Sequence, residues 1–383
     1  MLTYTFVQNI KILAAPGSIA NIGEVVGTAG YKKAMFIHGG SLRRSGVADA
    51  VKKSLAEHGV DCVDFEKVKS DPPASLVDEG ADFARENGCD CVIAIGGGSA
   101  IDMGKAINML RFNEGKVLEY LTKPHVHSPG LFVAPTTSGT GAELSTGSVI
   151  TDTEHNMKLP LPVYNSMPEV AILDPELTTS MPAAMTMQTG LDTFSHAVEG
   201  YCNVMSNMMM DSICEKIMEL VAENLPAAVA DGNDIQARSR MQVAACMSGW
   251  TLTNVYANVG HSLAHVVGAN YHIVHGSACS YGLPPVLKHM APAVPDKVKR
   301  IGMILGAEFD GSETPEQIGQ KAADAYIAFR DGLGMPPVTE AGIHVEDVDA
   351  LAELVVHEPF AQLTPVPVDH DAAVRMLKEM LAL

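Results

Sequence analysis

One stretch in the first third of the chain reads Cys91-Val92-Ile93-Ala94-Ile95-Gly96-Gly97-Gly98-Ser99-Ala100-Ile101-Asp102-Met103-Gly104-Lys105. Its apolar run, followed at once by glycines, predicts a buried strand that ends in a tight turn before a helix. Such glycines let the backbone approach a ligand closely, and the first turn of a helix offers free N–H groups to an anion such as pyrophosphate. The stretch lacks the GxGxxG dinucleotide fingerprint, and a glycine run alone is also typical of an ordinary turn.

The residues before this stretch alternate short apolar runs with helical patterns. Residues 34–37 and 62–65 predict strands, and residues 46–57 and 71–87 predict helices. Strand, helix and strand at these intervals indicate βαβ units, which form parallel sheets. The sequence therefore predicts an N-terminal α/β domain.

A second polar loop follows the apolar residues 131–134. It reads Pro135-Thr136-Thr137-Ser138-Gly139-Thr140-Gly141-Ala142-Glu143. Hydroxyls and glycines after a strand suit contacts to a phosphate or a ribose, although an ordinary Ser/Thr-rich turn has the same composition. Two such loops in one parallel-sheet domain favour a nucleotide ligand.

The second half of the chain carries one Asp/His pair and one His/His pair at helical spacing. Asp192 and His196 are four residues apart, as are His261 and His265, so each pair projects from one face of a helix. His275 follows after a short loop. One carboxylate and three imidazoles, Asp192, His196, His261 and His275, suit a borderline divalent ion such as Fe(II) or Zn(II). Capping or surface pairs have the same spacing, but these pairs lie among apolar residues, where unpartnered charges are costly.

Composition restricts the class of protein. The chain has 383 residues, of which 47% are hydrophobic, and this is enough for two globular domains. The net charge of −19 opposes nucleic-acid binding, and no apolar run is long enough to span a membrane. The N-terminus lacks the pattern of a secretory signal, so we expect a cytoplasmic protein with reduced, mostly buried cysteines.

Several blocks, in order along the chain, resemble the iron-containing (group III) alcohol dehydrogenases. They are Gly96–Ser99 with Asp102 and Lys105, residues 135–137 with 139–141, residues 174–178, and the Asp/His stretch. The resemblance implies a parallel-sheet dinucleotide-binding domain over residues 1–182 and an all-helical metal-binding domain over residues 183–383. This arrangement is the dehydroquinate synthase-like fold.

The resemblance also implies roles for individual residues. Asp192, His196, His261 and His275 are expected to hold one divalent metal, Fe(II) or alternatively Zn(II) or another ion. His265 is expected near the reacting centre, either as a proton relay or as support for the metal ligands. The positions expected to contact the cofactor are Gly97, Gly98, Ser99, Asp102, Thr137, Thr140 and Lys158.

The stretch after the strand at residues 34–37 bears on the choice of nicotinamide cofactor. It reads His38-Gly39-Gly40-Ser41-Leu42-Arg43-Arg44, with Gly39 where NAD-preferring relatives carry an aspartate. Gly39, Gly40 and Ser41 followed by arginines resemble NADP-preferring butanol and aldehyde reductases. Alternatively, both arginines point to solvent and contact no phosphate. We expect NADP(H) to be favoured slightly over NAD(H).

The sequence therefore predicts a metal-dependent, NAD(P)-linked alcohol dehydrogenase or aldehyde reductase. Hydride would pass between C4 of the nicotinamide and a short primary alcohol or aldehyde, and the metal would polarise the substrate oxygen. The resemblance also implies a homodimer or a larger homo-oligomer. The alternatives are a non-catalytic metal-binding protein and a dehydroquinate synthase-like lyase, which would need several basic side chains near the metal. The basic residues between the ligand motifs lie away from them and are Lys216, Arg238 and Arg240.

Overall fold

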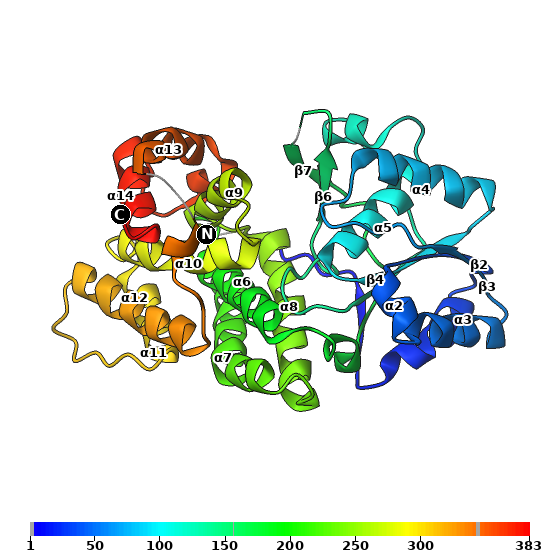
Figure 1. Cartoon of the computed structure of the whole chain (residues 1–383), viewed down its shortest axis with the longest axis horizontal. Helices are drawn as coiled ribbons and strands as arrows, with labels where there is room; N and C mark the ends of the chain where they lie inside the picture. Colours follow the sequence, from blue (N-terminus) through cyan, green and yellow to red (C-terminus); the bar gives the residue numbers. More distant parts are fainter. Residues whose placement is uncertain (1–3, 156, 342–344) are drawn as a thin grey trace. The chain divides into compact units, whose positions relative to one another are not determined.

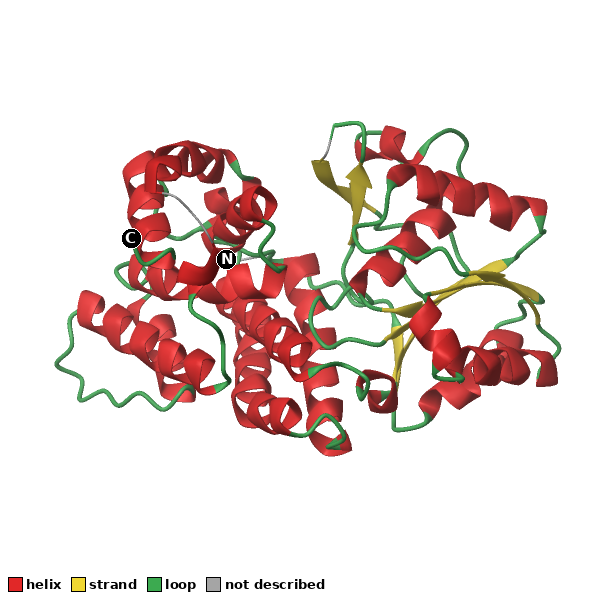
Figure 2. Cartoon of the chain, viewed as in Figure 1, coloured by secondary structure: helices red, strands yellow, loops and turns green. Residues whose placement is uncertain are grey.

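The computed structural model describes residues 4–155, 157–341 and 345–383 (Figures 1 and 2). The chain forms two compact units. The α/β unit comprises Gln8–Thr137 and Gly141–Ser180. The helical unit comprises Met181–Leu383, Ser138–Thr140 and the described residues 4–7. The predicted fold class, a parallel-sheet region followed by a helical region, is confirmed.

Within the described residues, the α/β unit contains a six-stranded parallel sheet in the order β1-β8-β5-β4-β2-β3. Its strands are β1 (Lys11–Ala14), β2 (Lys33–His38), β3 (Asp61–Phe65), β4 (Cys91–Gly96), β5 (Leu131–Pro135) and β8 (Val170–Leu173). Adjacent strands are in register at Phe36 and Ile93 and at Ile93 and Phe132. The central strand β4 is an unbroken apolar run because both faces of the sheet are covered.

Helices cover the two faces of this sheet (Figure 1). On one face, Val26 of α1 and Leu55 of α3 pack against Phe36 and Ile93 in one buried cluster. Helices α4 and α5 pack against each other, and α5 packs on β4 and β5. An antiparallel ribbon of two strands leaves the sheet after β5. The α-helices and the other two strands of the unit are α1 (Ile22–Thr28), α2 (Gly40–Arg44), α3 (Val47–Glu57), α4 (Ala74–Glu86), α5 (Gly98–Arg111), β6 (Gly147–Asp152) and β7 (Met157–Pro162).

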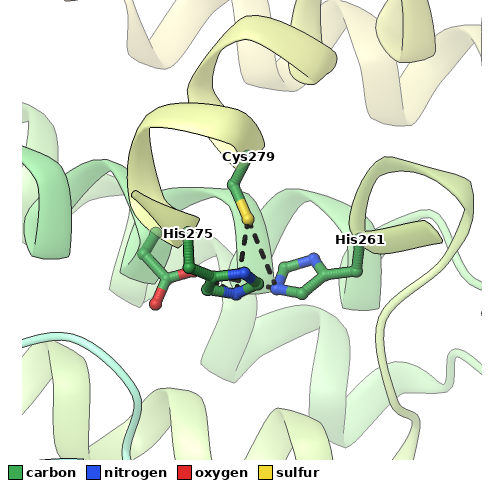
Figure 3. A group of neighbouring side chains, drawn as sticks. His261, His275 and Cys279 are labelled. Atoms are coloured by element: carbon green, nitrogen blue, oxygen red, sulfur yellow. Dashed lines mark hydrogen bonds and ion pairs between the residues drawn. The ribbon is translucent and has the colours of Figure 1, made fainter. Parts of the chain in front are cut away.

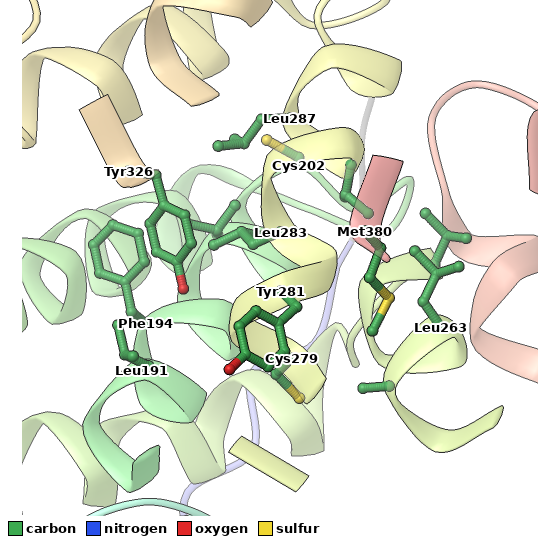
Figure 4. Close-up of a cluster of buried hydrophobic side chains, with 14 of the residues drawn as sticks. Leu191, Phe194, Cys202, Leu263, Cys279, Tyr281, Leu283, Leu287, Tyr326 and Met380 are labelled. Carbon is green, nitrogen blue, oxygen red and sulfur yellow. The ribbon is translucent and has the colours of Figure 1, made fainter. Parts of the chain in front are cut away.

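The helical unit has its own hydrophobic core (Figure 4). Leu191 and Phe194 of α6, Leu263 of α9 and Leu283 of α10 are fully buried there, and the ring of Tyr326 stacks on Phe194. The helices are α6 (Ala183–Tyr201), α7 (Met208–Ala230), α8 (Ile235–Asn254), α9 (Val259–Tyr271), α10 (His275–Met290), α11 (Pro295–Ile304), α12 (Pro315–Gly332), α13 (Val348–His357) and α14 (His370–Met380). Among the described residues, no helix combines the length and apolar character that a membrane crossing needs.

The local predictions from sequence agree with this fold. The strands predicted at residues 34–37 and 62–65 lie within β2 and β3, and the helices predicted at residues 46–57 and 71–87 contain α3 and α4. The predicted burial of the cysteines is also confirmed: Cys62 is half-buried and the other cysteines are buried.

Candidate functional site

Helix α6 supplies the first two side chains of the predicted metal site. Asp192 and His196 are one helical turn apart, and both are buried within the helical unit. The Asp192 Oδ1 atom has no hydrogen-bond partner within the described structure. A buried carboxylate oxygen without a partner is costly unless a cation occupies the space beside it.

Helices α9 and α10 bring two more imidazoles to the same oxygen. The Nε2 atoms of His261 and His275 lie 3.7 Å and 3.5 Å from Asp192 Oδ1, and His196 Nε2 lies 4.0 Å from it. His275 is the first residue of α10, and its side chain is 43% exposed at the rim of the group. The structure therefore brings together all four of the predicted ligands.

Glu199, one turn after His196 on α6, determines how His261 faces this group. Its Oε1 atom lies 2.7 Å from His261 Nδ1, and its Oε2 atom accepts the backbone N–H groups of Asn258 and His261 at 2.9 Å each. A carboxylate only accepts, so the proton of the His261 ring lies on Nδ1. In the neutral imidazole, the Nε2 lone pair then faces the Asp192 carboxylate, and a proton or a metal cation must lie between them.

Cys279 completes this group of donor atoms (Figure 3). Its Sγ atom lies 3.6 Å from His275 Nε2 and 3.8 Å from His261 Nε2. Donor atoms of Asp192, His261, His275 and Cys279 all lie within 4.8 Å of one another. Cys279 was not among the ligands predicted from sequence, although it follows His275 by one helical turn, the same spacing that identified the other pairs.

Burial and charge determine the protonation of these side chains. Burial lowers the pKa of His196 to about 4, although the Asp192 carboxylate favours the protonated ring. Desolvation and the neighbouring imidazoles also lower the pKa of His275. Desolvation opposes ionisation of Asp192, but the three imidazoles outweigh it and hold the pKa of this carboxyl well below its usual range. Burial raises the pKa of the Cys279 thiol to about 12. At neutral pH the site therefore presents a carboxylate and two neutral imidazoles, which are suitable ligands for a divalent cation.

Two glycines allow the helices to approach this closely. A Cβ atom on Gly276 would lie 2.1 Å from the backbone oxygen of Gln188 in α6. A Cβ atom on Gly260 would lie 2.6 Å from Glu199 Oε1. A side chain at either position would push α10 or α9 away from α6 and separate the ligands.

The donor side chains of Asp192, His196, His261, His275 and Cys279 are called the metal group below. His265, the predicted catalytic residue, lies beside this group and not within it. Its ring centroid is 5.5 Å from that of His275 and 5.9 Å from that of His261. His265 Nδ1 lies 2.7 Å from Glu358 Oε1, and Glu358 Oε2 accepts the hydroxyl of Ser262. The His265 side chain is 38% exposed, in a shallow hollow that Glu358 also lines. Glu358 therefore orients a ring that is open to solvent, a role that the sequence did not suggest.

In the α/β unit, the predicted cofactor loops follow three neighbouring strands. Gly39, Gly40 and Ser41 follow β2. Gly97 follows β4, and Gly98 and Ser99 begin α5. Thr137 follows β5. These strands are adjacent and parallel, in the order β5-β4-β2, so the loops lie at one edge of the sheet. The strand order also reverses between β4 and β2, and ligands of open α/β sheets bind at such a point.

The other predicted cofactor residues have structural contacts. Asp102 accepts the backbone N–H of Val149 at 3.0 Å and lies 3.2 Å from the buried Lys105 ammonium group. Lys158 lies on β7, is largely exposed and forms an ion pair with Asp71 at 2.7 Å. Thr140 belongs to the short segment that is grouped with the helical unit. Gly97 is next to Thr137, since a Cβ atom there would lie 3.3 Å from the threonine methyl group.

The comparison with protein families agrees with both units. The model of the iron-containing alcohol dehydrogenases matches residues 9–175, and the model of the C-terminal part of the Fe-containing alcohol dehydrogenase family matches residues 186–381. The chain belongs to the iron-containing alcohol dehydrogenase family. Its members include dehydrogenases and aldehyde reductases, so this assignment supports an alcohol oxidoreductase with a metal and a nicotinamide cofactor over the lyase alternative.

Individual relatives of this family are similar over nearly the whole chain. The NAD-dependent methanol dehydrogenase of Bacillus methanolicus is 33% identical over 95% of this chain and 96% of its own length. The NADPH-dependent butanol dehydrogenase of Clostridium saccharobutylicum is 30% identical over 97% of this chain and 96% of its own length. The structure of an alcohol dehydrogenase from Oenococcus oeni matches with a TM-score of 0.92 at 29% identity, covering 99% of this chain and all of that one.

Proposed function

We propose that this iron-containing alcohol dehydrogenase interconverts short primary alcohols and their aldehydes. Asp192, His196, His261 and His275 would hold the divalent metal, Fe(II) or alternatively Zn(II). The observation that carries this proposal is the buried Asp192 Oδ1 atom, which has no hydrogen-bond partner within the described residues and is faced by three imidazole Nε2 atoms at 3.5–4.0 Å. A carboxylate and neutral imidazoles in this arrangement fit a borderline divalent ion.

The side chains around this group have distinct tasks in the reaction. When bound, the metal supplies a Lewis acid that polarises the substrate oxygen. Glu199 holds the proton of His261 on Nδ1 and so keeps the Nε2 lone pair directed at Asp192 Oδ1. Glu358 likewise holds a proton on Nδ1 of His265, which leaves its Nε2 atom able to take up a proton and pass it to solvent.

The α/β unit would bind the nicotinamide cofactor. The turn at Gly97, Gly98 and Ser99 leads directly into α5, whose N-terminal N–H groups suit the pyrophosphate. Gly39, Gly40 and Ser41 would lie beside the adenosine ribose, and we propose a slight preference for NADP(H). Both cofactors occur among the relatives, since one is named for NAD and another for NADPH. We propose that residues 1–182 form the cofactor-binding domain and that residues 183–383 form the metal-binding domain.

The first experiment is reconstitution of chelated protein with Fe(II) or Zn(II) under anaerobic conditions. Short aldehydes are then offered with NADH and with NADPH. Metal-dependent oxidation of either cofactor supports the proposed reaction, and the NADPH/NADH ratio of kcat/KM measures the cofactor preference. A matched Gly39→Asp variant should shift that ratio towards NADH, because its carboxylate would repel a 2′-phosphate. Cofactor binding without turnover under any metal would contradict the proposed reaction.

We also propose a homodimer or larger homo-oligomer in the cytoplasm. Exposed apolar side chains gather before and at the start of α7, where Val204, Met205, Met208 and Met209 are 43–79% exposed. Such a cluster is typical of a surface that another subunit covers. The cytoplasmic location is supported by unpaired cysteines, most of which are buried. Light scattering tests the subunit number, and cell fractionation tests the location.

A further inference from the structure

Two sets of four donors overlap at the metal group. The set expected from the family contains His196, whereas a second set of donors, all within 4.8 Å of one another, contains Cys279 instead. Both sets share Asp192, His261 and His275. The Cys279 side chain points from α10 towards the two imidazoles (Figure 3), and the residue is buried.

The distances within the Cys279 set match those expected around one ion. Nitrogen and oxygen donors at about 2.1 Å from a tetrahedral metal lie roughly 3.4 Å apart, and a sulfur donor at about 2.3 Å lies roughly 3.6 Å from a nitrogen. The observed distances are 3.5 Å and 3.7 Å from Asp192 Oδ1 to the two imidazoles. They are 3.6 Å and 3.8 Å from Cys279 Sγ to the same nitrogens. Four of the six donor pairs therefore already have the spacing that one shared ion requires, and the other two pairs lie within 4.8 Å.

Hydrogen bonding alone does not account for this cluster. A thiol has one proton, yet Cys279 Sγ faces two ring nitrogens. With that proton donated to either nitrogen, the buried Asp192 Oδ1 atom still has no hydrogen-bond partner among the described residues, and a protonated His261 Nε2 atom would lie 3.7 Å from it, beyond hydrogen-bond distance. A cation shared by the four side chains satisfies the sulfur, both nitrogens and the carboxylate oxygen together.

We propose that Cys279 is an alternative to His196 as the fourth ligand of the metal site, beside the shared ligands Asp192, His261 and His275, and that its sulfur directs this site towards thiophilic ions such as Zn(II) over Fe(II). The inference rests on the metal site of the proposed function. Binding of the metal releases the thiol proton to water, and the thiolate bonds to the ion. Soft sulfur ligands favour zinc, whereas imidazole and carboxylate alone discriminate less between the two ions.

The test uses Co(II) as a spectroscopic substitute for the native metal. Full-length apoprotein loaded with one equivalent of Co(II) should show a near-ultraviolet sulfur-to-cobalt charge-transfer band. The band should vanish in Cys279→Ser and persist in Cys202→Ser, a buried cysteine of the same helical unit that is outside the donor cluster. A stoichiometric Co(II) complex of the wild type without this band, or a band that survives in Cys279→Ser, would overturn the inference.

A second measurement needs no variant. X-ray absorption of the Zn(II)-loaded wild type should show one sulfur at about 2.3 Å, whereas a shell of nitrogen and oxygen alone overturns the inference. In competition titrations, Cys279→Ser should lower the ratio of Zn(II) to Fe(II) affinity by at least about tenfold. These measurements need neither substrate nor cofactor, so a failed aldehyde assay leaves this inference standing. Equally, an active enzyme without metal–sulfur bonding would refute this inference alone.

Discussion

Replacement of Glu199 by glutamine tests how the metal group is held together. The carboxylate receives three N–H groups, two from the backbone of Asn258 and His261 and one from the His261 ring. The amide of Glu199→Gln has a single oxygen, so it cannot accept all three. If the oxygen stays with the two backbone groups, the amide NH₂ faces His261 Nδ1. The ring proton then moves to Nε2, and the lone pair facing Asp192 is lost.

The loss of metal affinity or of stability in Glu199→Gln depends on which way the introduced amide is oriented. Loss of the partner that fixes a metal-binding histidine costs about tenfold to a hundredfold in metal affinity, which is about 1.4–2.8 kcal/mol. The opposite amide orientation would leave two buried backbone N–H groups unpaired, at about 1–3 kcal/mol each in stability. We expect the first outcome, because it keeps both backbone hydrogen bonds and reverses only the one to the His261 ring.

The assay is a titration of apoprotein with Zn(II) against a chelator, together with thermal melting with and without the metal. Glu199→Gln should show weaker metal binding and a smaller increase of Tm on metal addition. Glu358→Gln is the matched control, because its carboxylate contacts His265, outside the donor set. Wild-type metal affinity and unchanged apoprotein Tm in Glu199→Gln would refute the argument that Glu199 fixes the His261 ring.

Three further predictions follow from the same group. Gly276→Ala should cost about 1–3 kcal/mol in stability and weaken metal binding, because its Cβ would lie 2.1 Å from a backbone oxygen of α6. Gly282→Ala, with its nearest contact at 3.6 Å, should be tolerated, and melting curves of both variants check this. The pKa of buried His196 is about 4 against the usual 6.5, so the unfolded chain binds the extra proton between these values. Apoprotein stability should therefore fall as the pH drops from 6.5 towards 4, and His196→Gln should flatten this part of a denaturation profile. His265→Ala should lower kcat by roughly a hundredfold with its metal content intact. Glu358→Gln should lower it less, and loss of metal from His265→Ala would contradict the proton relay.

The fold was predictable where local patterns are strong. The apolar runs of β2, β4 and β5 are unbroken because these strands are buried on both faces, and each is followed by a recognisable polar or glycine-rich loop. The β6–β7 ribbon was not identified, because its residues are partly exposed and include the prolines Pro160 and Pro162, which weaken a strand pattern.

The site was predictable only in part, for a related reason. The ligands on α6 and α9 appear in sequence as pairs at helical spacing, so local periodicity is enough to find them. Their supporting contacts are not local: Glu199 meets a ring 62 residues away, and Glu358 meets His265 from 93 residues away. Such pairs depend on how helices pack, and no spacing rule in one sequence gives this. Cys279 is different, because it follows His275 at the same helical spacing as the other pairs, which is a local signal present in the sequence.

The cofactor preference shows how neighbouring charges alter a prediction from sequence. Arg43 and Arg44 were expected to offer two positive charges to a 2′-phosphate. In the structure, Arg43 forms ion pairs with Glu66 and Asp64, and Lys52 also pairs with Asp64. Three carboxylates, Asp49, Asp64 and Glu66, thus face the two cations Arg43 and Lys52, and among the described residues Arg44 forms no ion pair. One exposed charge contributes up to about 1 kcal/mol to the binding of a 2′-phosphate, which is roughly a fivefold change in affinity. The NADPH/NADH ratio of kcat/KM should therefore stay within about an order of magnitude of unity. Glu66→Gln should raise the ratio by releasing Arg43, and Arg44→Ala should lower it. If neither variant changes the ratio, these arginines face solvent in the cofactor complex and the preference is determined elsewhere.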